Sequence, residues 1–166
     1  MKLIKPSYEI IPQAPGLEGI YKQIELAGRV CYKSEDKITE NSAKDFTDRM
    51  VKSNHLAMCE QGTVYLYLTL GSPLQDFKYL EIFSIVSFYC KNKFSIVNKI
   101  QDKYNDTINH FYITTNYRVI IENDKKSDLQ YLCEPTEYHE KRVTVKFITD
   151  IGCGREILRH KILCVA

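Results

Sequence analysis

The segment TVYLYLTL, residues 63–70, constrains the fold of this chain more than any other segment. Its apolar residues alternate strictly with tyrosines and a threonine. An alternation with a period of two predicts a β-strand that has one apolar and one polar face. The chain is therefore expected to contain at least one half-buried strand.

The residues that precede this strand predict one further strand and two helices. Residues 2–11 alternate loosely, whereas the apolar residues of 16–32 recur at helical spacing. After a charged loop at 33–40, a second helix begins at Ser42, which is predicted to form a capping pair with Asp45. Two helices that follow a strand indicate an α+β domain.

The long region from 71 to 142 is less regular. Its segment FYITTNYRVII, residues 111–121, is rich in β-forming residues and predicts a hairpin or strand pair that turns around Thr115 and Asn116. A short helix is predicted at 127–133. Arg118 is interpreted either as an anion contact or, more simply, as an exposed arginine on a strand.

The segment VTVKFITDIGCGREILRHKILCVA, residues 143–166, is chemically the richest. Alternation at 143–149 predicts a second half-buried strand, and Asp150 with the two glycines that follow predicts a turn and a helix N-cap. The consecutive cations Arg159 to Lys161 on that helix suit an anion such as a phosphate. A charged helix face exposed to water is the alternative explanation.

Length and composition predict one globular domain, residues 1–166, with a core of substantial size. The chain has 166 residues, 44% hydrophobic content and a net charge of +2. This charge balance argues against a nucleic-acid-binding protein, which usually carries a basic face. No apolar run is long enough for a signal peptide or a membrane span, so no membrane partner is expected. The six cysteines form no CxxC pair, and we expect a reduced, cytoplasmic protein.

The loop SNHLAMCEQG, residues 53–62, joins a predicted helix to a strand and is a second candidate site. His55 and Cys59 resemble half of a metal site, but no second pair accompanies them. A structural histidine is therefore favoured, and no metal is expected. The chain lacks both common glycine-rich phosphate motifs. Cys153 and Cys164 lie near cations and are either nucleophiles or ordinary buried residues.

Four segments together resemble the flavin-dependent thymidylate synthases. They are AGRVCYKS (27–34), NHLAMCEQG (54–62), VTVKFITD (143–150) and REILRHK (155–161). They occur in the order found in that family, and the last one is similar to its arginine-histidine-arginine signature. The resemblance covers nearly the whole chain, with 71–142 as an insertion of the kind that some members carry.

The resemblance implies an α+β subunit with a mixed or antiparallel sheet flanked by helices. Such subunits form a homotetramer with active sites where subunits meet. The resemblance also implies FAD as the cofactor, dUMP as the methyl acceptor, methylenetetrahydrofolate as the carbon donor and NADPH as the reductant. Reduced flavin, and not a cysteine, then drives the reductive methylation of dUMP to dTMP by hydride transfer.

The resemblance also implies roles for individual residues of this chain. The positions that contact or neighbour the flavin match His55, Glu60, Arg159, His160 and Lys161. Glu156 falls where the family has a residue that helps to hold the nucleotide. No catalytic residue is assigned.

The chain departs from the family pattern at three positions. Lys161 replaces the second arginine of the signature and lacks its planar fork. Cys164 stands in place of a serine, and Gln61 in place of a histidine. The family's dUMP-phosphate segment would follow Ala166, so the chain is expected to correspond to the front part of a subunit. Two hypotheses follow: an FAD-dependent thymidylate synthase, or a non-catalytic truncated member with at most weak flavin or nucleotide binding.

Overall fold

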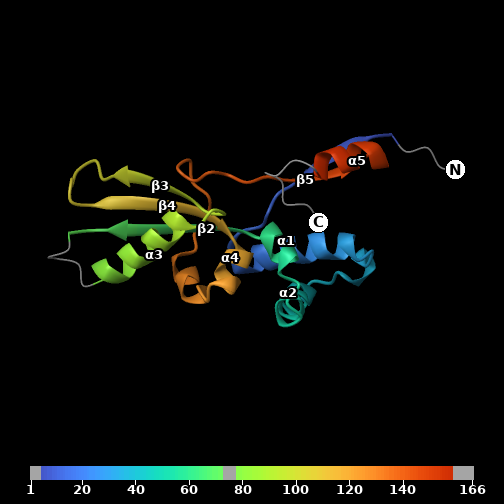
Figure 1. Cartoon of the computed structure of the whole chain (residues 1–166), viewed down its shortest axis with the longest axis horizontal. Helices are drawn as coiled ribbons and strands as arrows, with labels where there is room; N and C mark the ends of the chain where they lie inside the picture. Colours follow the sequence, from blue (N-terminus) through green and yellow to red (C-terminus); the bar gives the residue numbers. More distant parts are fainter. Residues whose placement is uncertain (1–4, 73–77, 159–166) are drawn as a thin grey trace.

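The computed structural model describes residues 5–72 and 78–158 and combines antiparallel strands with separate helices. In chain order the elements, with η for 3₁₀-helices, are β1 (Ser7–Ile11), α1 (Gly16–Cys31), η1 (Glu35–Lys37), α2 (Ser42–Lys52), η2 (Leu56–Gln61), β2 (Thr63–Leu70), α3 (Tyr79–Lys91), β3 (Ile96–Gln101), β4 (Asn109–Asn116), α4 (Tyr117–Glu122), η3 (Lys126–Tyr131), β5 (Thr144–Ile148) and α5 (Ile151–Leu158). This arrangement confirms the α+β class. Figure 1 shows an elongated molecule, with α3 and the strands β2, β3 and β4 towards one end and α1, α2 and α5 towards the other.

The described strands form two antiparallel sheets where the sequence suggests one. The first has the order β2-β4-β3, and the second consists of β1 and β5. The free edge of β2 is occupied by the segment after η3, through an isolated bridge between Leu66 and Leu132. The Cys133 N–H also donates to the Tyr65 carbonyl (3.0 Å). Strands β1 and β5 satisfy their backbone groups by pairing with each other.

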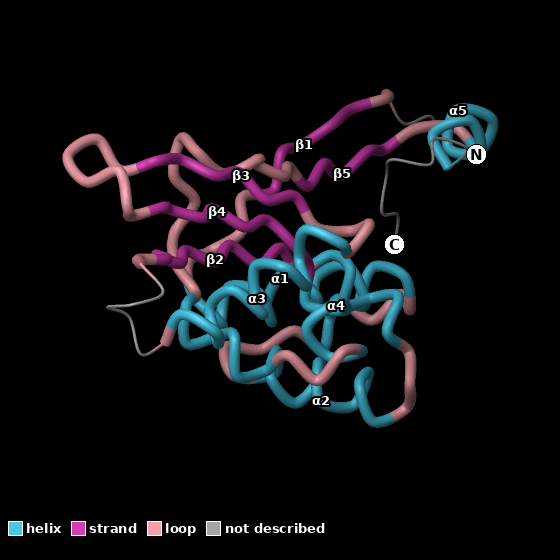
Figure 2. Tube along the Cα trace, turned by 60° about the vertical axis from the view of Figure 1, so that its left-hand side comes forward, coloured by secondary structure: helices cyan, strands magenta, loops and turns pink. Residues whose placement is uncertain are grey.

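The main core lies between the three-stranded sheet and helices α1, α3 and α4. Figure 2 shows α1 to α4 on one side of the strands, with α5 apart from them. The inner face of β2 carries Val64, Leu66 and Leu68, none of which is more than 1% exposed. Ile113 of β4 and Ile24 of α1 are also fully buried. The apolar face predicted for residues 63–70 is therefore confirmed.

The hairpin predicted at 111–121 is wrong. Strand β4 ends at Asn116, and helix α4 begins at the next residue. The Asn116 side chain accepts a hydrogen bond from the Val119 N–H (3.0 Å), which is the geometry of an N-cap. The cap turns the chain into a helix although its residues favour strands, and Arg118 consequently lies on a helix.

Two helix starts differ in detail from their predictions. The N-cap of α2 is Asn41, so the predicted Ser42–Asp45 capping pair is wrong. The Ser42 hydroxyl instead donates to Glu25 Oε2 (2.9 Å) and ties α2 to α1. The Asp150 side chain accepts a backbone N–H in the first turn of α5 (3.0 Å), which confirms its capping role. The two glycines after it lie inside α5 and not in a turn before the helix.

His139 fastens the loop between η3 and β5 to the sheet. The residue is 4% exposed, its Nδ1 accepts a hydrogen bond from the Thr136 N–H (3.1 Å), and its Nε2 lies 3.2 Å from the Leu66 carbonyl. These partners require a neutral ring with its proton on Nε2. Burial lowers the pKa of His139 below its ordinary value.

Acid is therefore expected to destabilise the fold through His139. The unfolded chain takes up this proton near pH 6.5, whereas the lowered pKa of the folded chain resists it. The contribution to the free energy of unfolding is present above about pH 6.5 and is lost below it, at up to about 1.4 kcal/mol per pH unit. Urea unfolding of wild type and His139→Gln across this range checks the sign. We expect a flatter pH dependence in the variant, and identical slopes would contradict the prediction.

Candidate functional site

A cleft of about 390 Å³ lies where the end of α1, the start of η2 and helix α4 meet. This volume falls within the range of small-molecule sites. The cleft is lined by Tyr32, Asn54, His55, Leu56, Ala57, Met58, Arg118 and Glu122. Aromatic, cationic and anionic side chains from three elements thus converge on one concave surface, which makes this cleft the candidate site.

A left-handed turn after α2 places His55 in the cleft. Asn54 has a φ of 57°, a conformation that asparagine adopts more readily than most residues, and it stands just beyond the helix end. The His55 N–H then donates to the Met50 carbonyl (2.8 Å). This hydrogen bond ties the start of the loop to the last turns of α2 and holds His55 in position.

Tyr32 and His55 meet in the cleft although 23 positions separate them in the sequence. The Tyr32 hydroxyl lies 3.2 Å from His55 Nδ1, and both residues are exposed. A phenol in contact with an imidazole offers proton donors and acceptors together with flat rings. The pair is suited to holding a heterocycle or moving a proton.

Arg118 lies between two carboxylates on the border of the cleft. Its Nη1 donates to Glu60 Oε1 (2.5 Å), and its Nε donates to Glu122 Oε1 (2.7 Å). The hydrogen bond to Glu122, followed in size of effect by the one to Glu60, raises the pKa of Arg118 above its ordinary value. The guanidinium therefore stays charged. The expectation of an exposed strand arginine is therefore corrected: the side chain is 36% exposed, ion-paired and on a helix.

A second cleft, of about 540 Å³, adjoins the first one through Tyr32. It lies between α1 and α2, and its lining includes Arg29, Arg49 and Lys52. Two nitrogens of Arg29 donate to Glu25 Oε1 (3.1 Å each), and both side chains are nearly buried. The Arg29 side chain thus has a structural role, in its ion pair with Glu25. Arg49 and Lys52, in contrast, lie exposed at the cleft.

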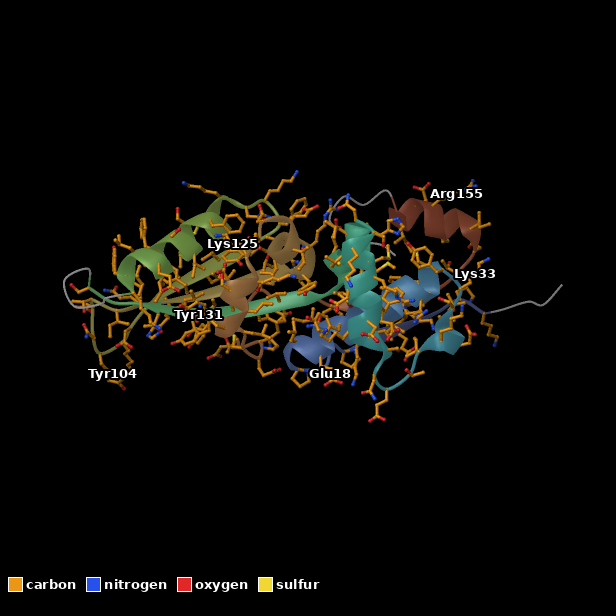
Figure 3. All side chains as sticks on the ribbon, turned by 90° about the horizontal axis from the view of Figure 1, so that it is seen from below. Glu18, Lys33, Tyr104, Lys125, Tyr131 and Arg155 are labelled. Atoms are coloured by element: carbon orange, nitrogen blue, oxygen red, sulfur yellow. The ribbon has the colours of Figure 1, made fainter. Side chains whose placement is uncertain are left out.

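The structure brings two of the predicted site residues close together. His55 lines the cleft, and Glu60 holds Arg118 at its border. Glu156 is exposed on α5 and belongs to the lining of neither cleft. Figure 3 shows Arg155 of α5 at the same end of the molecule as Lys33, the residue after Tyr32. The remaining predicted site residues, Arg159, His160 and Lys161, lie outside the described residues, as does Cys164.

Sequence reasoning does not find every residue of this site. It misses Tyr32, and it does not identify Asn54 as the turn that orients His55. An asparagine just after an apolar helical stripe is a signal for a left-handed helix end. Asn116, at the end of a β-rich run, is a similar signal for the cap that places Arg118 on a helix.

The cysteines and potential metal ligands contribute no reactive cluster to the described part of the chain. Cys153 is exposed on α5, which rules out the buried alternative for this residue. Burial raises the pKa of Cys59, next to Glu60, to about 11, so it is a poor thiolate nucleophile. Residues 5–72 and 78–158 contain no group of three or more His, Cys, Asp or Glu that is arranged to hold a metal ion. Within the same residues, no helix combines the length and apolar character needed to cross a membrane.

Comparison of the chain with protein-family models, with curated proteins and with solved structures gave no match.

Proposed function

We propose that this chain is a subunit of a flavin-dependent thymidylate synthase, which methylates dUMP reductively to dTMP. In this proposal FAD is the cofactor, methylenetetrahydrofolate donates the carbon and NADPH supplies the reducing equivalents. One observation carries the proposal beyond resemblance: two of the four segments that resemble the family converge on a single cleft.

The segment 27–34 forms the end of α1 and the residues after it, and the segment 54–62 forms η2 and its flanks. The hydrogen-bonding contact between Tyr32 and His55 (3.2 Å) joins these two segments inside the cleft. Motifs that match by chance have no physical reason to place their polar residues in contact. Their convergence supports the cleft as a site for flavin or nucleotide.

The side chains of the cleft fit parts of a flavin nucleotide. Tyr32 and His55 present flat rings for the heterocycle. When bound, FAD supplies the hydride-transfer chemistry. In this proposal the chain binds and orients the nucleotide, and the Tyr32–His55 pair holds a proton between its oxygen and nitrogen. The cations at 159–161 contact the flavin by resemblance, and Glu156 helps to hold dUMP.

An apolar face on the β1–β5 pair supports the homotetramer that is part of this proposal. Tyr8 and Phe147 lie opposite each other in the ladder and, with Ile10, share one face. These three side chains are 72%, 53% and 59% exposed, respectively. Clustered apolar residues on an otherwise polar surface favour association with other subunits.

A visible absorbance titration of the purified chain with FAD, and then with dUMP, tests the proposed function. We expect a bound-flavin spectrum that shifts when dUMP is added. His55→Ala should weaken FAD binding about tenfold, because the cleft loses a ring and a hydrogen-bonding group. His110→Ala is the matched control, since His110 lies on β4 and pairs with Asp102, away from the cleft lining.

Each outcome of this titration decides between the two hypotheses. Flavin that responds to dUMP, together with loss of affinity in His55→Ala alone, supports the synthase. Failure to bind FAD, or a bound flavin that does not respond to dUMP, would leave a non-catalytic member of the same fold. If His55→Ala and His110→Ala weaken FAD binding equally, the cleft is not the flavin site.

A further inference from the structure

Arg118 has unused hydrogen-bonding capacity at the Tyr32–His55 cleft. A guanidinium carries five N–H donors, and Arg118 uses one on Glu60 and one on Glu122. Its other three N–H groups donate to no group among the described residues. Among the described residues that line this cleft, Arg118 alone carries a permanent positive charge. The two carboxylates more than balance the charge of Arg118, but its remaining N–H donors still point to a role in binding the oxygen atoms of an anion.

The fold holds Arg118 in place before any ligand arrives. Asn116 caps α4, and the Tyr117 N–H donates to the Gly62 carbonyl (2.9 Å), which ties the start of α4 to the end of η2. The two carboxylates then fix the orientation of the guanidinium. A side chain that is already ordered loses less conformational entropy on binding, so its interactions contribute more fully to affinity.

We propose that Arg118 binds a phosphate group of the ligand that occupies this cleft. The planar guanidinium matches two phosphate oxygens, and the Tyr32 hydroxyl on the neighbouring wall is a further donor. The inference rests on the proposed function only in taking this cleft as the ligand site. It assigns phosphate recognition to a residue of the segment 71–142, which the family resemblance presents as an insertion. The phosphate is that of a nucleoside monophosphate or of a dinucleotide, and the recognition chemistry is the same.

The three-residue group Glu60–Arg118–Glu122 also has a purely structural interpretation, as an ionic link between η2 and α4. The two interpretations predict different effects of Glu122→Gln on anion binding. Two carboxylates around one cation oppose the approach of another anion. If Arg118 binds phosphate, Glu122→Gln should tighten that binding about twofold to fivefold. If Arg118 is only a link, the substitution alters stability and leaves anion binding unchanged.

Calorimetric titration with inorganic pyrophosphate at low ionic strength tests the proposal without flavin. We expect wild type to bind, Arg118→Gln to bind at least about tenfold more weakly, and Arg118→Lys to fall between them, because lysine keeps the charge but not the fork. The exposed helical pair Glu18–Lys22 supplies matched controls. Lys22→Gln and Glu18→Gln remove the same charges outside the lining of the cleft and should leave pyrophosphate affinity unchanged. Circular dichroism establishes that each variant is folded.

The proposal is overturned if wild type does not bind pyrophosphate, if Arg118→Gln binds as wild type does, or if Glu122→Gln fails to tighten binding. The source of the phosphate follows from titrating Arg118→Gln with dUMP and with FAD, since the ligand that loses affinity is the one whose phosphate Arg118 holds. Pyrophosphate binding by a chain that does not bind FAD would refute the proposed function and leave this inference standing. If the chain binds FAD, if Arg118→Gln does not alter that affinity, and if pyrophosphate does not bind, this inference is refuted and the proposed function stands.

Discussion

Ile113→Ala is expected to lower the free energy of unfolding by about 2–5 kcal/mol. Ile113 lies on the central strand β4, opposite Leu66 of β2 and Val97 of β3, and its side chain is fully buried. Truncation removes apolar contacts and leaves a cavity. Because β4 is hydrogen-bonded on both sides, the neighbouring strands are unable to close that cavity fully.

Urea unfolding followed by circular dichroism measures this change, and Ile100→Ala is its control. Ile100 is the same residue type on the edge strand β3, but it is 38% exposed. Its truncation should change the free energy of unfolding by less than about 1 kcal/mol. Similar losses in the two variants would mean that the core is not centred on β4.

Gly62→Ala is expected to lower the free energy of unfolding by about 1–3 kcal/mol, the range for an overpacked core. A Cβ atom at this position would lie 2.7 Å from Ile20 Cγ2 and 2.8 Å from Ile24 Cδ1. Both isoleucines are fully buried and branched at Cβ, so their χ1 angles are restricted and the packed core leaves them little room to move. The junction of η2 and β2 must shift instead, and the Gly62 carbonyl that accepts the Tyr117 N–H shifts with it.

Gly154→Ala is the matched control for this substitution. Among the described residues, no heavy atom outside the immediate neighbours and the backbone of the same helix lies within 4 Å of a Cβ built on Gly154, which is inside α5. Alanine there should stabilise the protein by about 0.5–1 kcal/mol, because it favours the helix. Thermal or urea unfolding of the two variants should therefore give shifts of opposite sign. A neutral Gly62→Ala would show that α1 does not pack against this junction as closely as the distances indicate.

Local periodicity predicts the elements that depend on near neighbours in the chain. The alternation at 63–70 and the helical stripe of 16–32 correspond to β2 and α1, because each pattern reports which face of one element is buried. The prediction for 111–121 fails because residue preferences for strands are weak, and the single cap at Asn116 outweighs them.

Sequence reasoning locates the candidate site in part. His55 directly precedes η2 and Glu60 lies within it, so their proximity follows from the chain itself. Tyr32 and Arg118 reach the same cleft from α1 and from α4, and no local pattern specifies that meeting. Whether Arg118 faces water or a carboxylate depends on where η2 packs, which is a property of the folded chain.

The sequence by itself determined the α+β class, the buried face of β2 and the loop that carries His55, because these follow from residue type and spacing within single elements. Only the tertiary structure decided that the described strands divide into two sheets, that Arg118 is held between Glu60 and Glu122, and that Tyr32 meets His55. The physical reason is that these features depend on contacts between segments that are distant in sequence. Such contacts form when a strand edge is filled or a helix is capped, and periodicity does not record either event.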